Sequence, residues 1–318
     1  MNNFERTINK WRTATDTNIK IDGKDGAARA TIKLDMATVT VLSNVRFEGK
    51  PFYIEPDDLK TIKRVDDLRL VNDSQFVGDL TVDIPERKEE EELEPVEFTP
   101  GDYFVARDDL DYVLTATSTD LTRPVLNAVC FTKEHMVSTD GYRLHFAHGE
   151  YYQGETDLPL LPNHILGRIK SDFRITHNDN HSVINFEDRD NKVIVKIDWM
   201  VGTFPDYRAI VPSETKIKFR IPEDKRLKKV IGDKIGIVTL GDTFQYETRE
   251  GKYTNICTTF TLEPEYIEGK PEEPVKFGIN PKILYEAIRE WPAEIGFNAP
   301  NTPIVVDGSV AMPMHIGD

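Results

Sequence analysis

Residues 122–144 read TRPVLNAVCFTKEHMVSTDGYRL, and this stretch contains two local signals of β-structure. Asp140-Gly141 stands between the β-like triplets 137–139 and 142–144, which predicts a two-residue hairpin turn because both central positions of such a turn need positive φ. Upstream of the turn, Ala128-Val129-Cys130-Phe131 is a short run of strand-forming residues. The middle of the chain is therefore expected to form antiparallel sheet.

Outward from this stretch, a strand followed by a proline and a short helix recurs at intervals of about a hundred residues. The proline stands at the start of each helix, where its missing N–H would have no intrahelical partner. A β-like run follows each helix, and an earlier helix precedes each strand. The three copies are residues 52–64, 160–170 and 277–289, followed by strands at 68–71, 173–176 and 294–297 and preceded by helices at 4–15, 110–118 and 225–233.

Alternating runs between these helices complete the pattern as sheet. They include residues 38–42, 193–197 and 259–262. The sequence therefore predicts an α+β fold of three repeated units, each with two helices against antiparallel sheet. The alternative is that α+β stretches of this length resemble one another without a true repeat.

A proline-bracketed charge run at residues 85–95, PERKEEEELEP, cannot pack in a core. We interpret it as a solvated linker or edge loop, and a functional acidic tail is the alternative. A second candidate join lies at residues 211–215. The predicted domains are therefore residues 1–95, 96–212 and 213–318.

The composition of the 318-residue chain is that of a soluble folded protein, with 30 % charged and 39 % hydrophobic residues. Its two cysteines, Cys130 and Cys257, provide neither a disulfide framework nor paired zinc ligands, which favours a reducing cytoplasm. The first residues lack an apolar signal core, and no run of about eighteen apolar residues could span a membrane. A net charge of -15 argues against a protein that coats DNA over its whole surface, so any DNA contact must be local.

Three ordered motifs in residues 101–318 resemble those of the bacterial sliding clamp, the β subunit of the replicative DNA polymerase. The motifs are residues 122–129 with 138–144, residues 202–212 (GTFPDYRAIVP) and residues 311–316 (AMPMHI). The first hundred residues match only by the repeat pattern. Tyr142 and His315 depart from the family, which usually has histidine and arginine at these two positions.

The resemblance implies a catalytically inert DNA-replication processivity factor of three clamp-type domains, two copies of which close head to tail as a homodimer ring around duplex DNA. The implied partners are duplex DNA without sequence preference, the replicative DNA polymerase, a separate clamp loader ATPase and a second copy of this chain. The alternative is a divergent clamp-like interaction protein that keeps a partner-binding groove but does not close around DNA.

The resemblance also implies a hydrophobic groove that accepts a short peptide motif from partner proteins. Without the family, the same segments are explained as a hairpin turn, a turn with aromatic anchors at 204–207 and an edge segment at 312–314. Methionine and branched aliphatic side chains suit such a groove because they make an adaptable apolar surface. The implied lining residues, called the predicted groove below, are Leu126, Thr139, Gly141, Arg143, Leu144, Pro205, Ile210, Val310, Met312, Pro313 and Met314.

Basic residues on the paired helices are the candidates for phosphate contacts, since a clamp needs no base-specific contacts. Each of them also fits an ordinary solvated helix face, and only their recurrence favours DNA. The loop that carries Asp120 and Arg123 resembles a loop that contacts DNA in the family. Arg123 matches a basic position of that loop, whereas Asp120 stands where the family has a neutral residue. The candidates are Arg123, Lys60, Lys63, Arg64, Arg168, Lys170, Lys225, Lys228, Lys229, Lys282 and Arg289. Val230 and Ile231 are candidates for the interface between two chains, or for the core of their own domain.

Clusters of acidic residues and histidines are explained without an active site. One acidic cluster opens a helix, where carboxylates favour the positive end of the dipole, and the other lies in a predicted hairpin turn. The histidine pair flanks a predicted turn, and no phosphate-binding glycine loop or nucleophile elbow occurs. We therefore expect no catalytic activity, no metal and no cofactor. The clusters are Asp108-Asp109 with Asp111, Glu187-Asp188 with Asp190, and His177 with His181.

Overall fold

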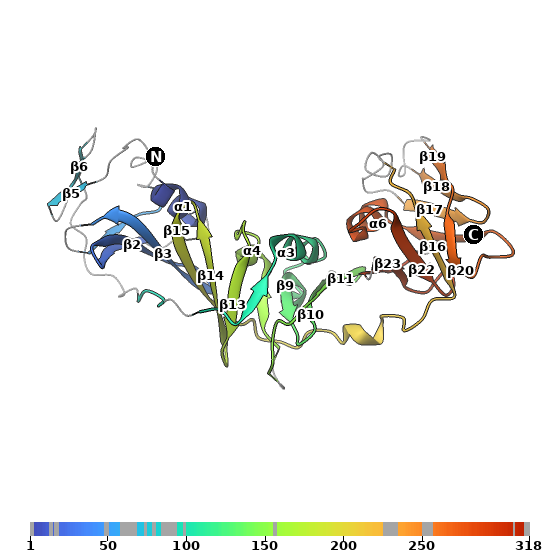
Figure 1. Ribbon diagram of the computed structural model, residues 1–318, viewed down its shortest axis with the longest axis horizontal. Helices are drawn as coiled ribbons and strands as arrows, with labels where there is room; N and C mark the ends of the chain where they lie inside the picture. Colours follow the sequence, from blue (N-terminus) through green and yellow to red (C-terminus); the bar gives the residue numbers. More distant parts are fainter. Residues whose placement is uncertain are drawn as a thin grey trace. The chain divides into compact units, whose positions relative to one another are not determined.

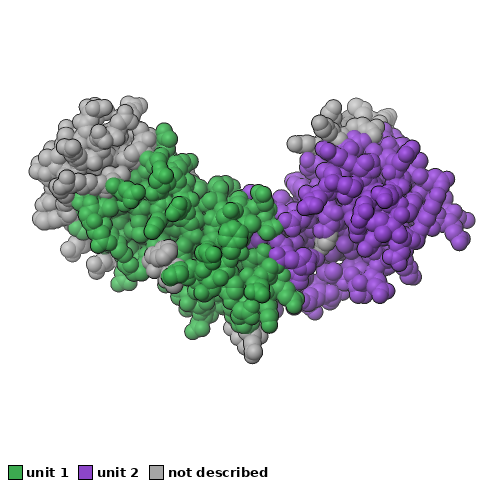
Figure 2. Space-filling view, in the orientation of Figure 1, with its two compact units in different colours: residues 1–110, 130–134, 149–201 green, residues 111–129, 135–148, 202–318 purple. Residues whose placement is uncertain are grey.

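The chain forms two compact units, coloured separately in Figure 2. Unit 1 contains residues 1–110, 130–134 and 149–201, and unit 2 contains residues 111–129, 135–148 and 202–318. The structure is a computed structural model that describes residues 3–12, 15, 19–47, 51–57, 69–72, 75–77, 81–83, 94–97, 100–154, 158–224, 235–249, 257–307 and 309–314.

Unit 1 is built on one eight-stranded antiparallel sheet (Figure 1). Its centre is the pairing of β3 with β15, in register from Lys192 opposite Leu42 to Ile197 opposite Ala37. This pairing joins the first hundred residues to the middle of the chain, so both belong to one folded unit. The strand order is β4 (Phe52–Ile54), β1 (Ile19–Lys24), β2 (Ala27–Lys33), β3 (Ala37–Arg46), β15 (Asn191–Asp198), β14 (His181–Asp188), β13 (Phe173–His177) and β8 (Tyr103–Val105).

Helix α1 (Asn3–Arg12) packs on β2, β3 and β15 of this sheet. Phe4, Ile8 and Trp11 are buried and recur at helical spacing, so they form the apolar face that holds the helix in place. Unit 1 also contains β12 (Leu160–Pro162), the short helix α4 (Asn163–Leu166) and a separate three-stranded sheet of β5 (Arg69–Asn72), β6 (Gln75–Val77) and β7 (Thr81–Asp83).

Unit 2 contains two sheets. The strands of the larger sheet that lie wholly in unit 2 follow the order β10 (His135–Thr139), β11 (Arg143–His148), β24 (Ser309–Ala311), β23 (Ile304–Val306), β22 (Ala293–Phe297), β16 (Ile217–Ile221) and β20 (Glu265–Glu268). The smaller, four-stranded sheet has the order β19 (Cys257–Leu262), β18 (Phe244–Arg249), β17 (Ile235–Leu240) and β21 (Val275–Ile279).

A shared aromatic core connects the two sheets of unit 2. Phe219 of β16, Phe244 of β18 and Phe297 of β22 are fully buried, and the ring centroid of Phe219 lies 6.0 Å from that of Phe244 and 6.5 Å from that of Phe297. Helix α6 (Pro281–Ala287) covers this core with Leu284 and Ala287. Unit 2 also holds the 3-10 turns η1 (Pro124–Asn127) and η2 (Tyr207–Ala209), while α3 (Arg107–Leu114) and β9 (Ala128–Phe131) are each divided between the units.

The expected α+β composition is confirmed, with mostly sheet and four α-helices among the described residues. Helix α6 begins as expected, with Pro281 as its first residue and the Asn280 side chain accepting a hydrogen bond from the Lys282 N–H at 2.9 Å. Before α4, however, Pro162 is the N-cap rather than the first helical residue. Residues 58–64 of the helix expected after Pro56, and the whole helix expected at 225–233, lie outside the described residues, and the division into three domains remains a prediction.

Helix α3 was expected at 110–118 but begins at Arg107 and ends at Leu114. Its start is fixed by a distant side chain, because the Asp172 carboxylate accepts a hydrogen bond from the Arg107 N–H at 2.8 Å. Beyond its end, the Thr115 and Thr117 hydroxyls donate to nearby backbone carbonyls, at 2.7 and 2.8 Å. Such local bonds compete with continuation of a helix.

The close packing around Gly236 in β17 gives a test of the unit 2 fold. A Cβ atom at this position would lie 2.6 Å from the Ile279 carbonyl oxygen and against the Tyr246 hydroxyl. Gly236→Ala should therefore lower the free energy of unfolding by about 1–3 kcal/mol, measured by urea denaturation. Gly241→Ala is the control, since its Cβ would meet Pro274 at an ordinary 3.4 Å. Equal stability of the two variants would contradict this packing.

Candidate functional site

The predicted groove residues lie within unit 2, and several of them are on β11, on β24 and on the segment that follows β24. These strands pair antiparallel, with Arg143 opposite Ala311 and Leu144 opposite Val310. The segment after β24 continues along the site, because the Met312 N–H donates to the Tyr142 carbonyl and the Met314 N–H donates to the Gly278 carbonyl, both at 2.8 Å. Residues 312–314 are therefore fixed between the β10–β11 turn and β21.

The β10–β11 hairpin is confirmed, but its turn is longer than the predicted two residues. Thr139 pairs with Leu144, and only Gly141 of the predicted pair has positive φ, at 92°. The Asp140 carboxylate closes the longer turn by accepting hydrogen bonds from the N–H groups of Tyr142 and Arg143, at 2.9 and 3.0 Å. A carboxylate that caps two backbone donors removes the need for a tight turn at this position.

The predicted groove residues divide by exposure into three groups. Ile210 and Met314 are 42 % and 36 % exposed, so their side chains are available to a partner. Gly141 and Pro205 are also exposed, while Arg143, Met312 and Pro313 are half-buried. The remaining residues, Leu126, Thr139, Leu144 and Val310, are buried and act as support beneath the site.

The segment at 202–210 is held by two aromatic anchors, as its sequence predicts. Phe204 and Tyr207 are buried, at 9 % and 6 % exposure, while the intervening Pro205 is exposed. The 3-10 turn η2 follows directly, and Ile210 closes it through a 3.2 Å hydrogen bond from its N–H to the Tyr207 carbonyl. The two buried rings thus present Pro205 and Ile210 on the surface.

Arg143 links the hairpin turn to helix α6. Its guanidinium lies 3.0 Å from the Asp140 carboxylate and also donates to the Glu286 carboxylate, and its side chain is only 9 % exposed. Because both carboxylates are engaged with Arg143, its charge is neutralised within the protein. We therefore do not expect it to bind a carboxylate of a partner.

A stacked pair of rings lies beneath the site and was not predicted from the sequence. Tyr112 and His145 stack with centroids 4.6 Å apart and an angle of 10° between planes. The Tyr112 hydroxyl donates to the Ala287 carbonyl at 2.8 Å and also hydrogen-bonds the Ser309 hydroxyl, so it ties α3 to α6 and β24. Burial raises the pKa of Tyr112 to about 12 and lowers the pKa of His145 to about 4.

The predicted DNA-contacting residues have unlike surroundings. Lys170 and Arg289 are exposed, and Lys282 is 55 % exposed with its ammonium 4.0 Å from Glu286. Arg123 is 52 % exposed and paired with Asp120 at 3.0 Å, whereas Arg168 is half-buried and donates to the Lys10 carbonyl at 3.0 Å. The residues Lys60, Lys63, Arg64, Lys225, Lys228 and Lys229, with the interface candidates Val230 and Ile231, lie outside the described residues.

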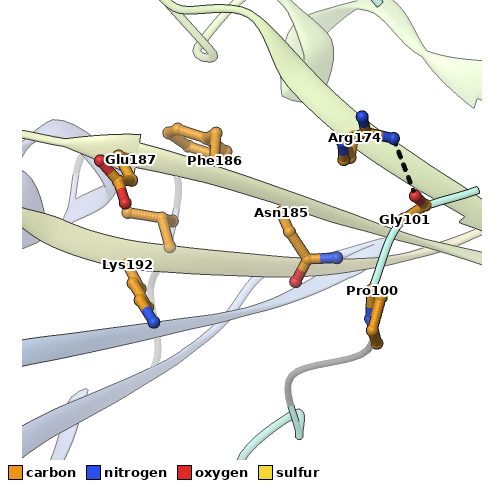
Figure 3. Close-up of a pocket in the computed structure, with 8 residues that line it drawn as sticks. Pro100, Gly101, Arg174, Asn185, Phe186, Glu187 and Lys192 are labelled. Carbon is orange, nitrogen blue, oxygen red and sulfur yellow. Dashed lines mark hydrogen bonds between the residues drawn. The ribbon is translucent and has the colours of Figure 1, made fainter. Parts of the chain in front are cut away.

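A separate cavity of about 430 Å³ lies on the sheet of unit 1 (Figure 3). Pro100 and Gly101 lie at the edge of this cavity, where the Arg174 guanidinium donates a hydrogen bond to the Gly101 carbonyl at 3.3 Å. Phe186 and Asp188 face Lys10 of α1, so Asn185 and Glu187 of the same strand point to the opposite face, toward the cavity. The lining carries both charges and does not identify a ligand.

Within the described part of the chain, no three histidine, cysteine or acidic side chains gather as metal ligands. The acidic residues at 108–111 open α3, and those at 187–190 lie at the β14–β15 turn, as their sequences predict. Among the same residues, no helix is both long enough and apolar enough to cross a membrane.

No known family profile matches the sequence, and no curated protein matches it in sequence. Solved structures do match the fold. A DnaN sliding clamp (DNA polymerase III subunit beta) from Bartonella birtlesii, bound to griselimycin, has 16 % identity and a TM-score of 0.78 over 98 % of each chain. The DNA polymerase III beta subunit of Thermotoga maritima has 18 % identity and a TM-score of 0.76, over 99 % of this chain and 98 % of its own. That of Borrelia burgdorferi, in complex with a natural product, has 17 % identity and a TM-score of 0.77, over 98 % and 97 %.

The chain has the sliding-clamp fold. The resemblance carried by the three sequence motifs is thus confirmed at the level of the fold. The sliding-clamp match covers almost the whole chain, including the first hundred residues, where the sequence offered only a repeat pattern.

The buried His145 makes unit 2 of this sliding-clamp fold sensitive to acid. Its pKa of about 4 in the folded protein lies below the ordinary value near 6.5, so the unfolded chain takes up a proton first as the pH falls. The contribution of His145 to stability is fully present well above pH 6.5 and should decrease by about 3 kcal/mol as the pH falls to 4. Chemical denaturation at several pH values measures this loss.

His145→Gln is the matched variant, because glutamine does not titrate and the remaining titratable groups are common to both proteins. The variant should lose less stability between pH 6.5 and 4 than the wild-type chain, whatever its absolute stability. An identical pH dependence in the two proteins would exclude the buried imidazole as the cause.

Proposed function

We propose that this chain is a DNA sliding clamp, a catalytically inert processivity factor that encircles duplex DNA and tethers the replicative polymerase to it. The observation that carries the proposal is the sliding-clamp fold along 98 % of the chain, matched to 98 % of a solved DnaN clamp. The soluble, DNA-associated role of such a protein agrees with a cytoplasmic location.

Encircling DNA requires a second copy of the chain. A homodimer closed head to tail would join domain one (1–95) of one chain to domain three (213–318) of the other, with Val230 and Ile231 as candidate contacts. Loading such a ring requires a separate clamp loader ATPase, because the sequence contains no phosphate-binding glycine loop.

The acidic net charge of -15 is compatible with DNA binding if the lysine and arginine side chains that contact DNA are concentrated on one part of the surface. Topological linkage keeps a ring on DNA, so the phosphate contacts have only to be weak enough for sliding. Arg123, Lys170, Lys282 and Arg289 are the exposed candidates among the described residues, and Arg123 is paired with Asp120. Arg168 is a weaker candidate, since its guanidinium already binds the Lys10 carbonyl.

Partner proteins would bind the exposed part of the predicted groove. Ile210 and Met314 provide the exposed apolar side chains, and the half-buried Met312 and Pro313 continue the same surface. Binding of a short peptide there gains apolar burial but costs ordering of the peptide, which gives about micromolar affinity. Such weak binding allows polymerase and other partners to exchange.

The alternative function is a clamp-like interaction protein that binds partner peptides without closing around DNA. Solution mass separates the two functions. A stable particle of twice the chain mass of 36.4 kDa is expected for the ring, and a monomer at micromolar concentration for the alternative.

The combined variant Ile210→Ala with Met314→Ala tests partner binding. Loss of the two exposed side chains should weaken the binding of a peptide from the replicative polymerase by about 30-fold in Kd, or about 2 kcal/mol, measured by calorimetry. Leu144→Ala is unsuitable because Leu144 is fully buried and its truncation would cost about 2–5 kcal/mol of stability.

Ile267→Ala is the control for this experiment, since Ile267 is 44 % exposed on β20 and is not part of the predicted groove. Its peptide affinity should equal that of the wild-type chain. If the double variant binds the peptide as tightly as Ile267→Ala does, the groove assignment is wrong.

Retention on closed circular DNA tests the ring itself. After loading by the cognate clamp loader, the protein should stay with circular duplex DNA through gel filtration at high salt and leave when the DNA is cut once. Only topological linkage predicts this difference, because ordinary phosphate contacts are weakened equally by salt on both forms. Equal retention on circular and linear DNA would favour the alternative function.

A further inference from the structure

Two histidines face each other across the β10–β11 hairpin, at the end away from its turn. His135 and His148 are directly opposite in the strand register, and His135 Nε2 lies 3.1 Å from His148 Nδ1. His148 is exposed and His135 is half-buried. The backbone of two paired strands therefore holds two imidazole nitrogens together at the surface.

The His135 ring is oriented by its neighbours. Its other nitrogen, Nδ1, lies 3.0 Å from the hydroxyl of the buried Tyr207. Phe146 packs against both imidazoles, with ring centroids 5.1 Å from His135 and 5.3 Å from His148. A ring held on one nitrogen by a hydrogen bond presents the other nitrogen in a defined direction.

We propose that His135 and His148 form a two-histidine chelate for a divalent transition metal, with zinc as the representative ion. Two nitrogens bound to a tetrahedral zinc at about 2.0–2.1 Å lie about 3.3 Å apart. The observed separation of 3.1 Å is close to this value. The ion would lie beside the line between the nitrogens, on the solvent side, and the exposed His148 ring has room to turn toward it.

Metal binding requires a change of tautomer and a rotation of the rings toward the ion, because the two nitrogens face each other across a hydrogen bond in the metal-free protein. In the metal-free protein one hydrogen atom lies between Nε2 of His135 and Nδ1 of His148. When the ion binds, that hydrogen moves to the other nitrogen of the ring that carried it, and both lone pairs face the metal. The Tyr207 oxygen then accepts a hydrogen bond from His135 Nδ1–H, which is the usual role of a group behind a metal-bound histidine.

Two coordination positions remain open in this chelate. Among the described residues no third histidine, cysteine or carboxylate completes a group of three. A structural zinc site is closed by four protein ligands, whereas a site with free positions takes water or a side chain from another molecule. The geometry therefore points to an exchangeable ion rather than to a permanent structural one. Imidazole ligands suit zinc, copper and nickel.

The test is a calorimetric titration of the full-length chain, without a histidine tag and after treatment with a chelator, with zinc chloride. The wild-type chain should bind zinc at this site, and His148→Ala and His135→Ala should each weaken that binding at least tenfold. Tyr207→Phe keeps both ligands and should weaken it by about tenfold. Circular dichroism of each variant checks that the fold is intact.

His181→Ala is the matched control, because His181 also lies on a strand next to a hairpin turn, but its ring nitrogens face Asn178 and Asn180 instead of a second imidazole. This variant should bind zinc as the wild-type chain does. The proposal fails if the wild-type chain has no saturable zinc binding, or if His148→Ala binds zinc as tightly as His181→Ala. None of these outcomes depends on whether the chain encircles DNA.

Discussion

The antiparallel pairing of β11 with β24 is the constraint on which the candidate site depends. It joins a strand from the middle of the chain to the last strand of the described residues, and it buries Leu144 and Val310 between them. Hydrogen bonds extend the pairing beyond the strands, from Met312 to Tyr142 and from Met314 to Gly278. The turn after β10, the edge of β21 and residues 312–314 thus form one continuous surface because two strands pair.

Polar interactions beneath this surface link it to two helices. Arg143 is neutralised by Asp140 and Glu286, and the Tyr112 hydroxyl binds the end of α6 and Ser309. Partly buried ion pairs of this kind contribute little net stability, but removal of one partner leaves an uncompensated charge. Their effect is to fix the relative position of the turn, α3 and α6.

Local sequence signals predicted the elements that are determined locally. Pro281 after Asn280 predicted the start of α6, and the apolar run at 128–131 predicted β9. The prediction of a two-residue turn was wrong because the Asp140 carboxylate closes a longer one. The limits of α3 were misplaced because Asp172, which is distant in the sequence, caps its first residue. A short-range pattern contains no information about such a partner.

The candidate site was predicted from the sequence only as a set of segments. Leu144 and Val310 were predicted to line the groove, but a sequence motif does not show which face of the sheet a side chain occupies. Both side chains are buried. Glu286, Tyr112 and His145 had no sequence signal, because each acquires its role through contacts made across the folded unit. For the same reason the sequence did not predict that His135 and His148 lie opposite each other, because this depends on the register of the two strands.

The connection of β11 to β24 also has a consequence for how the protein is made. A ribosome that adds about 5–20 residues per second takes roughly 10–30 s to pass from residue 148 to residue 309. During that interval the nascent hairpin of β10 and β11 has no partner for its outer edge. Unpaired strand edges are where polypeptides associate with the wrong chain. Synthesis of this protein therefore includes an interval in which the edge of β11 is exposed to other chains.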